Sequence, residues 1–421
     1  MTAERQEVRT RRVFYIPGYD PIHPRRYREL YRKEGAAQAE ISGYDLSLAP
    51  KTTSGPYGWQ ATGHMDGTEV TAEIEVLVWS DIVRTSMSSS IPATYAQLVR
   101  TAWTYIASGA LRRLMLLRKG PVIAALYPVG MLLLQALVAL VAALLIWSGL
   151  SRAVFSALSW LGLETTGTFW TVVDLVLLIP GLAAAVWVLR WFKAKDGKLF
   201  AYYLMHDYAY SARLKGANPP ELEARMAEFT DIVADALLAP GDEVLVVGHS
   251  SGAHLAVSIL ADLIRQGRVP ANGPALSFLS LGQVVPMVSF LPKANRLRAD
   301  LRYLSARKEL TWVDVTAPGD GCAFALCDPV AVSGVAPKDK RWPLVFSAAF
   351  TQTLSDARWK ELRWKFFRLH FQYLCAFDRV RDYDYFRITA GPLTLGTRYA
   401  DRKPSNSRID IPVSKYTTVA A

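Results

Sequence analysis

The chain is poor in the residues that mark a disulfide-stabilised fold or a zinc site. Its 421 residues include only three cysteines, Cys322, Cys327 and Cys375, and no two of them have the C-x-x-C spacing. An odd number of cysteines without that spacing argues against a disulfide framework and against structural zinc. A phosphate-binding loop, a dinucleotide fingerprint and a cluster of metal-ligand residues are also absent, so we expect neither a cofactor nor a metal.

Other absences narrow the choice of compartment and partner. The N-terminal stretch MTAERQEVRTRR is charged and has no apolar signal-peptide core, so we expect the first folded segment to stay in the cytoplasm. The 48 Lys and Arg residues exceed the 37 Asp and Glu residues and give a net charge of +11, which suits an anionic partner. Because zinc-finger spacings, RNA-binding signatures and a long basic tail are missing, we expect a membrane surface and no nucleic acid.

Charged residues are missing from one long stretch in the first half of the chain. Residues 120–150 contain none, and this length exceeds the roughly 20 residues that span a bilayer. A second apolar run, 169–192, contains Asp174 near its start and Arg190 near its end. Basic residues flank the outer ends of this pair of runs, namely Arg112, Arg113, Arg118 and Lys119 before it and Lys193, Lys195 and Lys198 after it. The positive-inside tendency therefore predicts a transmembrane hairpin, with helices at about 121–149 and 169–191 and both ends in the cytoplasm. Two buried helices of a large soluble core are the alternative.

On both sides of this segment, apolar patterns of strand and helix type alternate. Strands are predicted at 13–16, 68–81, 242–248, 274–285, 309–317 and 341–350, helices at 24–40, 219–239 and 252–267, and a loop at 47–67. Alternation of this kind predicts an α/β fold with a mostly parallel sheet covered on both faces. We expect a domain made of 1–84 and 200–390, an insertion at 85–199 between its second and third strands, and a C-terminal tail at 391–421.

The sequence GHSSG, residues 248–252, joins one of these strands to the helix that follows it. A serine at such a turn is forced into a strained backbone conformation, so the residues two positions away must be small, as Gly248 and Gly252 are. The N-terminus of the next helix directs backbone N–H groups at a developing oxyanion. The pattern therefore predicts that Ser250 is a nucleophile.

With this motif the chain resembles the α/β-hydrolase superfamily, of the serine esterase and lipase type, over roughly 13–81 and 200–375. The resemblance implies the chain order serine, acid, histidine. Of the six histidines, His370 is the one that follows both Ser250 and the helix after it, and it would be the general base. The acid would lie in a loop after a late strand, which favours Asp320; Asp314 and Asp328 are the alternatives.

The resemblance also implies an oxyanion hole formed by two backbone N–H groups. One would belong to Ser251, the residue after the nucleophile. The other would come from the loop YIPGYDP after the first strand, where Gly18 lets the backbone approach closely and Tyr19 donates its N–H. Pro17 stands where the family commonly has a histidine, so the identity of the second donor stays open.

The sequence around His370 predicts one basic amphipathic helix over 356–371. Its apolar residues are Trp359, Leu362, Phe366 and Leu369, with Arg358, Lys360, Arg363, Lys365 and Arg368 between them. Such a helix either lies on a membrane surface or packs its apolar face on the sheet.

Together these features predict an integral membrane protein that is a serine hydrolase, with its catalytic domain on the cytoplasmic side. Ser250, His370 and Asp320 would cleave an ester or thioester of a lipid-like substrate, and the 121–191 hairpin would bind the bilayer. A non-catalytic membrane scaffold or transport-associated subunit, and an acyltransferase with the same residues, are the alternatives. No pattern indicates an oligomeric state.

Overall fold

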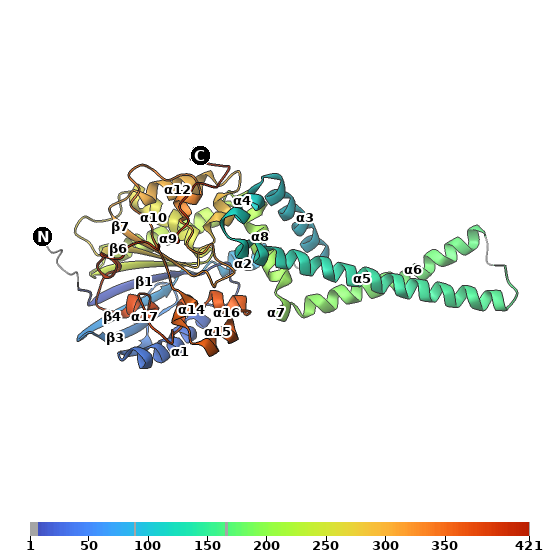
Figure 1. Ribbon diagram of the computed structural model, residues 1–421, viewed down its shortest axis with the longest axis horizontal. Coiled ribbons are helices and arrows are strands. Elements are labelled where there is room, and N and C mark those ends of the chain that lie inside the picture. The colour runs from blue at the N-terminus through green and yellow to red at the C-terminus, as the bar shows by residue number, and fades with distance from the viewer. Residues whose placement is uncertain (1–6, 88–89, 165–166, 421) are drawn as a thin grey trace. The chain divides into compact units, whose positions relative to one another are not determined.

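The computed structural model describes residues 7–87, 90–164 and 167–420, and within them it has one eight-stranded sheet (Figure 1). The strands are β1 (Thr10–Ile16), β2 (Asp45–Pro50), β3 (Gly58–Met65), β4 (Thr68–Val76), β5 (Glu243–His249), β6 (Ala275–Leu281), β7 (Leu310–Thr316) and β8 (Leu344–Ser347). Their order is β2-β3-β4-β1-β5-β6-β7-β8. Neighbours from β4 to β8 pair in parallel, whereas β3 pairs antiparallel with both β2 and β4. The prediction of an α/β fold with a mostly parallel sheet is confirmed.

Strands β2 and β3 occupy most of the segment that was expected to be a loop, and that expectation is wrong. Side chains of β3 alternate between buried and less buried positions, with Trp59, Ala61 and Met65 on the buried face. Small and polar residues between them hide this alternation in the sequence. The Asp66-Gly67 pair, both residues at positive φ, makes the tight turn from β3 to β4 and was the available sequence signal.

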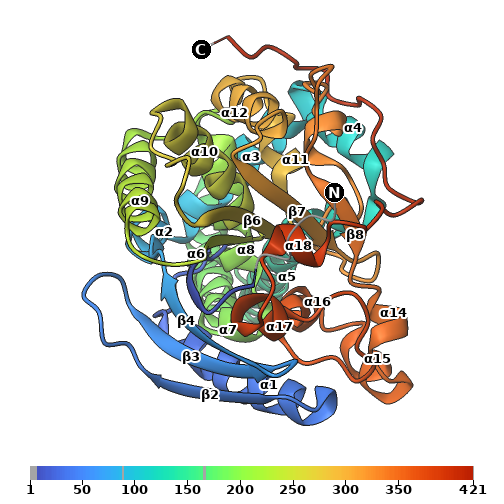
Figure 2. The same ribbon diagram turned by 90° about the vertical axis from the view of Figure 1, so that its left-hand side faces the viewer.

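Helices cover both faces of the sheet, with α9, α10 and α12 on one face and α1 and α17 on the other (Figure 2). The first ten helices are α1 (Arg25–Ser42), α2 (Ser80–Ser86), α3 (Ile91–Ala107), α4 (Ala110–Leu117), α5 (Lys119–Trp160), α6 (Thr168–Ala194), α7 (Asp196–Leu199), α8 (Ala201–Arg213), α9 (Pro220–Leu238) and α10 (Gly252–Arg265). The others are α11 (Val285–Ser289), α12 (Asn295–Ser305), α13 (Pro329–Val332), α14 (Phe350–Thr353), α15 (Asp356–Leu362), α16 (Phe366–His370), the 3-10 helix η1 (Gln372–Leu374), α17 (Tyr385–Ala390) and α18 (Leu395–Arg398).

The chain divides into two compact units. Unit 1 consists of Met1–Ser86, Trp103–Ala124 and Ser211–Ala421 and holds the sheet, whereas unit 2 consists of Met87–Ala102 and Ala125–Tyr210. The helical segment inserted into the sheet domain connects β4 to β5, the fourth and fifth strands in chain order. It was expected between the second and third strands, and the difference arises because β2 and β3 were not foreseen.

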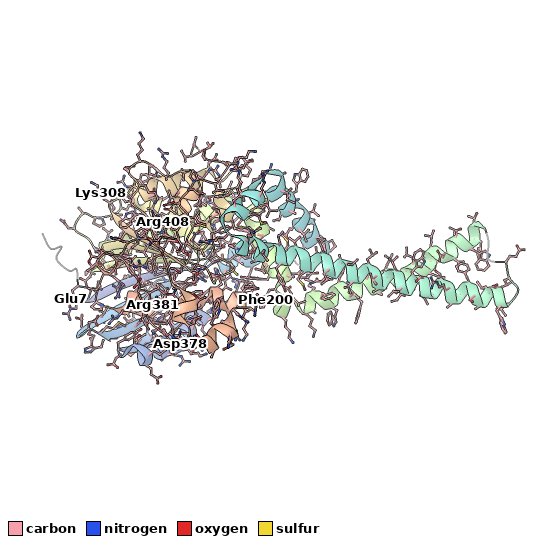
Figure 3. All side chains as sticks on the ribbon, viewed as in Figure 1. Glu7, Phe200, Lys308, Asp378, Arg381 and Arg408 are labelled. Atoms are coloured by element: carbon pink, nitrogen blue, oxygen red, sulfur yellow. The ribbon has the colours of Figure 1, made fainter. Side chains whose placement is uncertain are left out.

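Unit 2 contains most of two long apolar helices, α5 and α6, whose side chains project around their circumference (Figure 3). Both are long and apolar enough to cross a membrane. In the most apolar 18-residue stretch of each helix, only 22% is buried in α5 and 6% in α6. The helices contact each other, since the Trp147 indole donates to the Asp174 carbonyl oxygen at 3.1 Å and Gly181 lies against the Ala143 carbonyl. A core helix of a soluble protein would bury its apolar residues, so this exposure argues against the soluble-core alternative.

The C-terminal residues, expected as a tail, pack along unit 1. Ser405 N–H donates to the Val345 carbonyl in β8 at 2.9 Å, and Ile409 N–H donates to the Leu326 carbonyl at 2.7 Å. Near the end of the chain the Thr418 carbonyl accepts from the Arg298 guanidinium at 2.9 Å. These contacts make the segment part of the folded unit.

Candidate active site

Ser250 lies at a sharp turn between the end of β5 and the start of α10. Its φ is +56°, which is uncommon for a residue other than glycine. The Ser250 N–H donates to the Leu281 carbonyl of the adjacent strand at 2.9 Å, and the Ser250 carbonyl accepts from the Ala253 N–H at 3.2 Å. The strained serine is thus held by β6, the neighbour of β5, and by α10, the helix that follows it.

The two glycines of the pentapeptide allow the backbone to pack closely at this turn. A Cβ atom at Gly252 would lie 2.1 Å from the Ile16 carbonyl oxygen at the end of β1. A Cβ atom at Gly248 would lie 2.7 Å from the Ala253 Cα atom in α10. Both distances are far shorter than a real contact allows, so larger residues would push the turn apart.

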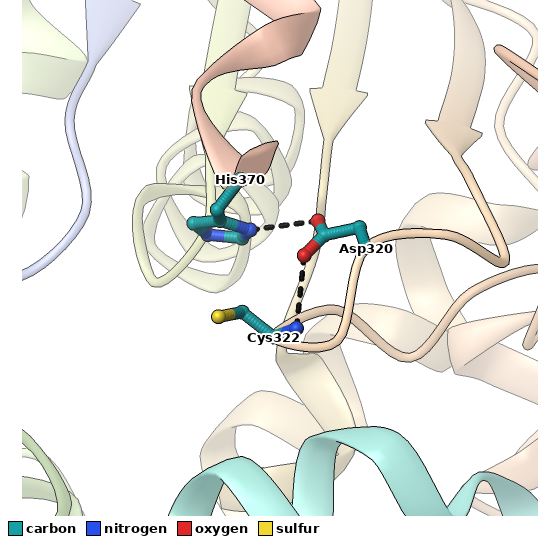
Figure 4. Close-up of side chains that lie close together, drawn as sticks. All are labelled: Asp320, Cys322 and His370. Atoms are coloured by element: carbon teal, nitrogen blue, oxygen red, sulfur yellow. Dashed lines mark hydrogen bonds and ion pairs between the residues drawn. The ribbon is translucent and has the colours of Figure 1, made fainter. Parts of the chain in front are cut away.

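His370 and Asp320 form a buried pair, with 2.7 Å between His370 Nδ1 and Asp320 Oδ2 (Figure 4). The Asp320 carboxylate accepts two further hydrogen bonds, from the Cys322 N–H at 2.8 Å and from the Tyr373 hydroxyl at 3.0 Å. The Tyr373 oxygen in turn accepts from the Ala317 N–H at 2.9 Å. Three donors on one carboxylate fix its orientation, and therefore that of the imidazole.

The two alternative acids are occupied elsewhere. Asp314 lies inside β7, accepts from the Ser280 hydroxyl at 2.5 Å, and has its pKa raised to about 8 by burial. Asp328 caps α13 by accepting from the Val330 and Ala331 N–H groups, and pairs with Lys340 at 2.5 Å. The structure therefore brings Asp320 to His370 and gives Asp314 and Asp328 other partners.

A second buried histidine, His249, supports the backbone of His370, and the sequence did not indicate this role. Its Nε2 lies 3.0 Å from the His370 carbonyl oxygen and its Nδ1 lies 3.3 Å from the Tyr15 hydroxyl. A carbonyl can only accept, so His249 Nε2 carries the proton and Nδ1 accepts from Tyr15. Burial, reinforced by repulsion from His370, lowers the pKa of His249 to about 3 and keeps this ring neutral.

This burial predicts a loss of stability in mild acid. The pKa of His254 is also lowered by burial, to about 4, so the folded state keeps both rings neutral while the unfolded chain protonates them below about pH 6.5. The unfolded state then binds more protons, and each ring costs about 1.4 kcal/mol per pH unit as the pH falls from 6.5 towards 4. Asp314, whose pKa burial raises to about 8, contributes a slope of the opposite sign over the same range. The histidine contribution is therefore measured as the difference between the detergent-solubilised parent chain and His254→Leu. His254→Leu should make the slope shallower, and an unchanged slope in that variant would contradict the prediction.

Ser250 and His370 lie at the same end of the sheet. The Leu281 carbonyl binds the Ser250 N–H, and a Cβ atom on the next residue, Gly282, would lie 3.1 Å from His370 Cε1. The rings of His249 and His370 have centroids 4.9 Å apart. No hydrogen bond joins the Ser250 hydroxyl to the His370 ring within the described ranges, as is common before a substrate tightens the site.

Two of the expected oxyanion-hole residues, Gly18 and Ser251, lie next to Ser250. A Cβ atom at Gly18 would lie 2.9 Å from Ser250 Cβ and 3.3 Å from its Oγ, so the loop after β1 contacts the serine side chain. Ser251 begins the turn into α10, and its N–H makes no hydrogen bond to any residue that the structure describes. Tyr19, beside Gly18, is buried, and its hydroxyl lies 2.6 Å from the Ser86 hydroxyl.

Among the described residues, one group of three side chains could bind a metal ion. Atoms of Asp320, Cys322 and His370 that could bind a metal lie within 4.8 Å of one another. The hydrogen bond between His370 and Asp320 already engages a nitrogen and an oxygen of this group, and the Cys322 N–H binds the other Asp320 oxygen. The group is thus explained as a hydrogen-bonded acid–base pair, and we assign it no metal.

The segment leading to His370 is broken into two helices, so the prediction of one continuous helix is wrong. Helix α15 ends at Leu362, and α16 begins at Phe366. Leu362 and Leu369 are buried, and the Trp359 ring lies against Gly319 beside Asp320. This face packs on unit 1, whereas residues 363–365 between the helices and Phe366 at the start of α16 are exposed.

No protein-family description, curated protein sequence or solved structure matches the chain.

Proposed function

We propose that the chain is a membrane-anchored serine hydrolase of the α/β-hydrolase type that cleaves a carboxylic ester or thioester. The observation that carries this proposal is the combination of a strained Ser250 between β5 and α10 with the buried His370–Asp320 pair at the same end of the sheet. A serine in a structural turn would need neither the positive φ nor an oriented imidazole nearby.

In the proposed reaction the Ser250 hydroxyl attacks the carbonyl carbon while His370 Nε2 accepts the hydroxyl proton. Asp320 holds Nδ1–H and stabilises the imidazolium that forms. The Ser251 N–H and an N–H of the Gly18–Tyr19 loop stabilise the negative oxygen of the tetrahedral intermediate. The leaving alcohol or thiol takes the proton from His370, and an acyl ester remains on Ser250. Water, activated by the same imidazole, then releases the acid and restores the serine.

We further propose that α5 and α6 form a transmembrane hairpin that anchors the enzyme. Arg and Lys residues flank the outer ends of the pair, which favours a cytoplasmic position for unit 1. An active site held close to a bilayer favours substrates with acyl chains over small soluble esters. The bilayer and a lipid-like ester are therefore the partners that the proposal implies.

Turnover of p-nitrophenyl butyrate by the detergent-solubilised full-length chain tests the proposal. We expect a burst of nitrophenol of about one equivalent per chain if deacylation is slow, or steady turnover if it is fast. Added alcohol should divert the acyl group to a new ester if the chain is an acyltransferase. Absence of any turnover across short and long acyl chains would favour the non-catalytic scaffold.

A further inference from the structure

The loop that carries Asp320 is in contact with the beginning of α5. We define residues 317–328, between β7 and α13, as the acid loop. A Cβ atom at Gly120 would lie 3.6 Å from Gly321 Cα, and the Arg118 guanidinium donates to the Ala325 carbonyl at 2.8 Å. On its other side Gly321 meets the Phe366 ring, because a Cβ atom there would lie 3.1 Å from Phe366 Cδ1. All of these residues belong to unit 1.

Exposed apolar side chains lie on the two segments that contact the acid loop. Trp364, between α15 and α16, is 72% exposed, and Phe366, the first residue of α16, is 45% exposed. Leu116 is 69% exposed and Met115 is 41% exposed on α4, immediately before α5. We call these four residues the apolar rim. Single exposed apolar residues are ordinary, but four of them on both neighbours of one catalytic loop indicate a contact surface.

Positively charged side chains lie next to the residues of the apolar rim in the sequence. On the α4 side Arg112 and Lys119 are exposed, and α4 contains no acidic residue. Between α15 and α16, Arg363 stacks its guanidinium over the Trp364 ring at 5.6 Å from the centroid. Lys365 pairs with Glu361, an acid of the same segment. Tryptophan beside Arg and Lys is the composition found at the interface of a bilayer with anionic headgroups.

The course of α5 locates this membrane. Its charged first residue, Lys119, is followed by 31 residues, 120–150, without a charge, so a span formed by α5 would begin at Lys119 and Gly120. Gly120 contacts the acid loop within unit 1, so a membrane boundary at Gly120 would lie close to the His370–Asp320 pair.

We propose that the apolar rim docks on the anionic bilayer surface and presents the active site to esters held in that bilayer. This inference rests on the proposed hydrolase function and narrows its substrate class to membrane-resident acyl esters. Trp364 and Leu116 act by positioning the site at the interface and take no part in the chemistry.

The test compares two substrates for one double variant. The full-length chain is reconstituted in phosphatidylglycerol vesicles, with Trp364→Ala and Leu116→Ser combined. Hydrolysis of a long-chain ester dispersed in those vesicles should fall about tenfold or more, because two interfacial apolar anchors are lost. Hydrolysis of water-soluble p-nitrophenyl butyrate should stay within about twofold, since neither residue touches the reacting groups. Leu238→Ala combined with Ile41→Ala, two exposed positions on α9 and α1, serves as the matched control and should change neither rate.

A binding measurement separates docking from catalysis. The fluorescence of Trp364 is obtained as the difference between the parent chain and Trp364→Phe. Brominated phosphatidylglycerol in the vesicles should quench this difference. Absence of this quenching, an equal loss with both substrates, or no loss with either would overturn the docking surface. A rim-dependent change of oligomeric state without quenching would assign the surface to a second copy instead, and would also overturn it. If quenching occurs but neither ester is cleaved, the hydrolase proposal fails while the docking surface stands.

Discussion

Ser250→Ala is expected to lower the rate of ester hydrolysis by about 10⁴-fold or more, because the nucleophile that forms the acyl ester is lost. The fold should persist, since the backbone hydrogen bonds of Ser250 to Leu281 and Ala253 do not use its hydroxyl. Initial rates with p-nitrophenyl butyrate, measured alongside circular dichroism, check both statements.

The neighbouring serine provides the matched control for this variant. Ser251 is proposed to act through its backbone N–H, so Ser251→Ala should retain activity within about fivefold of the parent chain. If Ser251→Ala were the inactive protein and Ser250→Ala the active one, the assignment of the nucleophile would be wrong.

Asp320→Asn is expected to lower kcat by about 10⁴-fold while leaving the fold intact. The neutral amide is isosteric but no longer holds Nδ1–H or stabilises the imidazolium, so the imidazole adopts the wrong tautomer for accepting the Ser250 proton. The three donors that now converge on the carboxylate also lose one charged acceptor. Single-turnover kinetics separate this loss from a change in substrate binding.

Substitutions of Asp314 and Asp328, the two alternative acids, serve as controls for Asp320→Asn. Asp314→Asn should stay near parental activity, because burial raises the pKa of Asp314 to about 8 and the side chain is already neutral at pH 7. Asp328→Asn keeps a helix-capping oxygen but weakens the pair with Lys340, which affects stability more than rate. A loss in either variant as large as in Asp320→Asn would show that the triad acid has been misassigned.

The parts of the site that could be predicted from sequence were those defined by contiguous residues. The turn around Ser250 is specified locally by a strand, two glycines and a helix, so its pattern is visible in a short window. The pairing of Asp320 with His370 depended on the chain order implied by the resemblance, and Asp314 and Asp328 could not be separated from Asp320 by spacing alone. Their distinction comes from partners such as Ser280 and Lys340, which only the fold brings close.

The features that were missed depend on long-range contacts or on small departures from regular patterns. His249 supports His370 across 121 positions of sequence, and Tyr15 binds His249 across 234. The interruption between α15 and α16 leaves the apolar periodicity of a helix intact, so the exposed Trp364 was not foreseen. Strands β2 and β3 went unrecognised because small and polar residues fill the positions between their buried side chains.

Mapping a fluorophosphonate adduct tests the central claim most directly, because such probes react with an activated serine and retain its mass label. The full-length chain in detergent should gain a single adduct, located on the peptide that contains Ser250. Ser250→Ala should gain none under the same conditions. Equal labelling of parent and variant, or no labelling of the folded parent, would contradict the proposal that Ser250 is the nucleophile of a serine hydrolase.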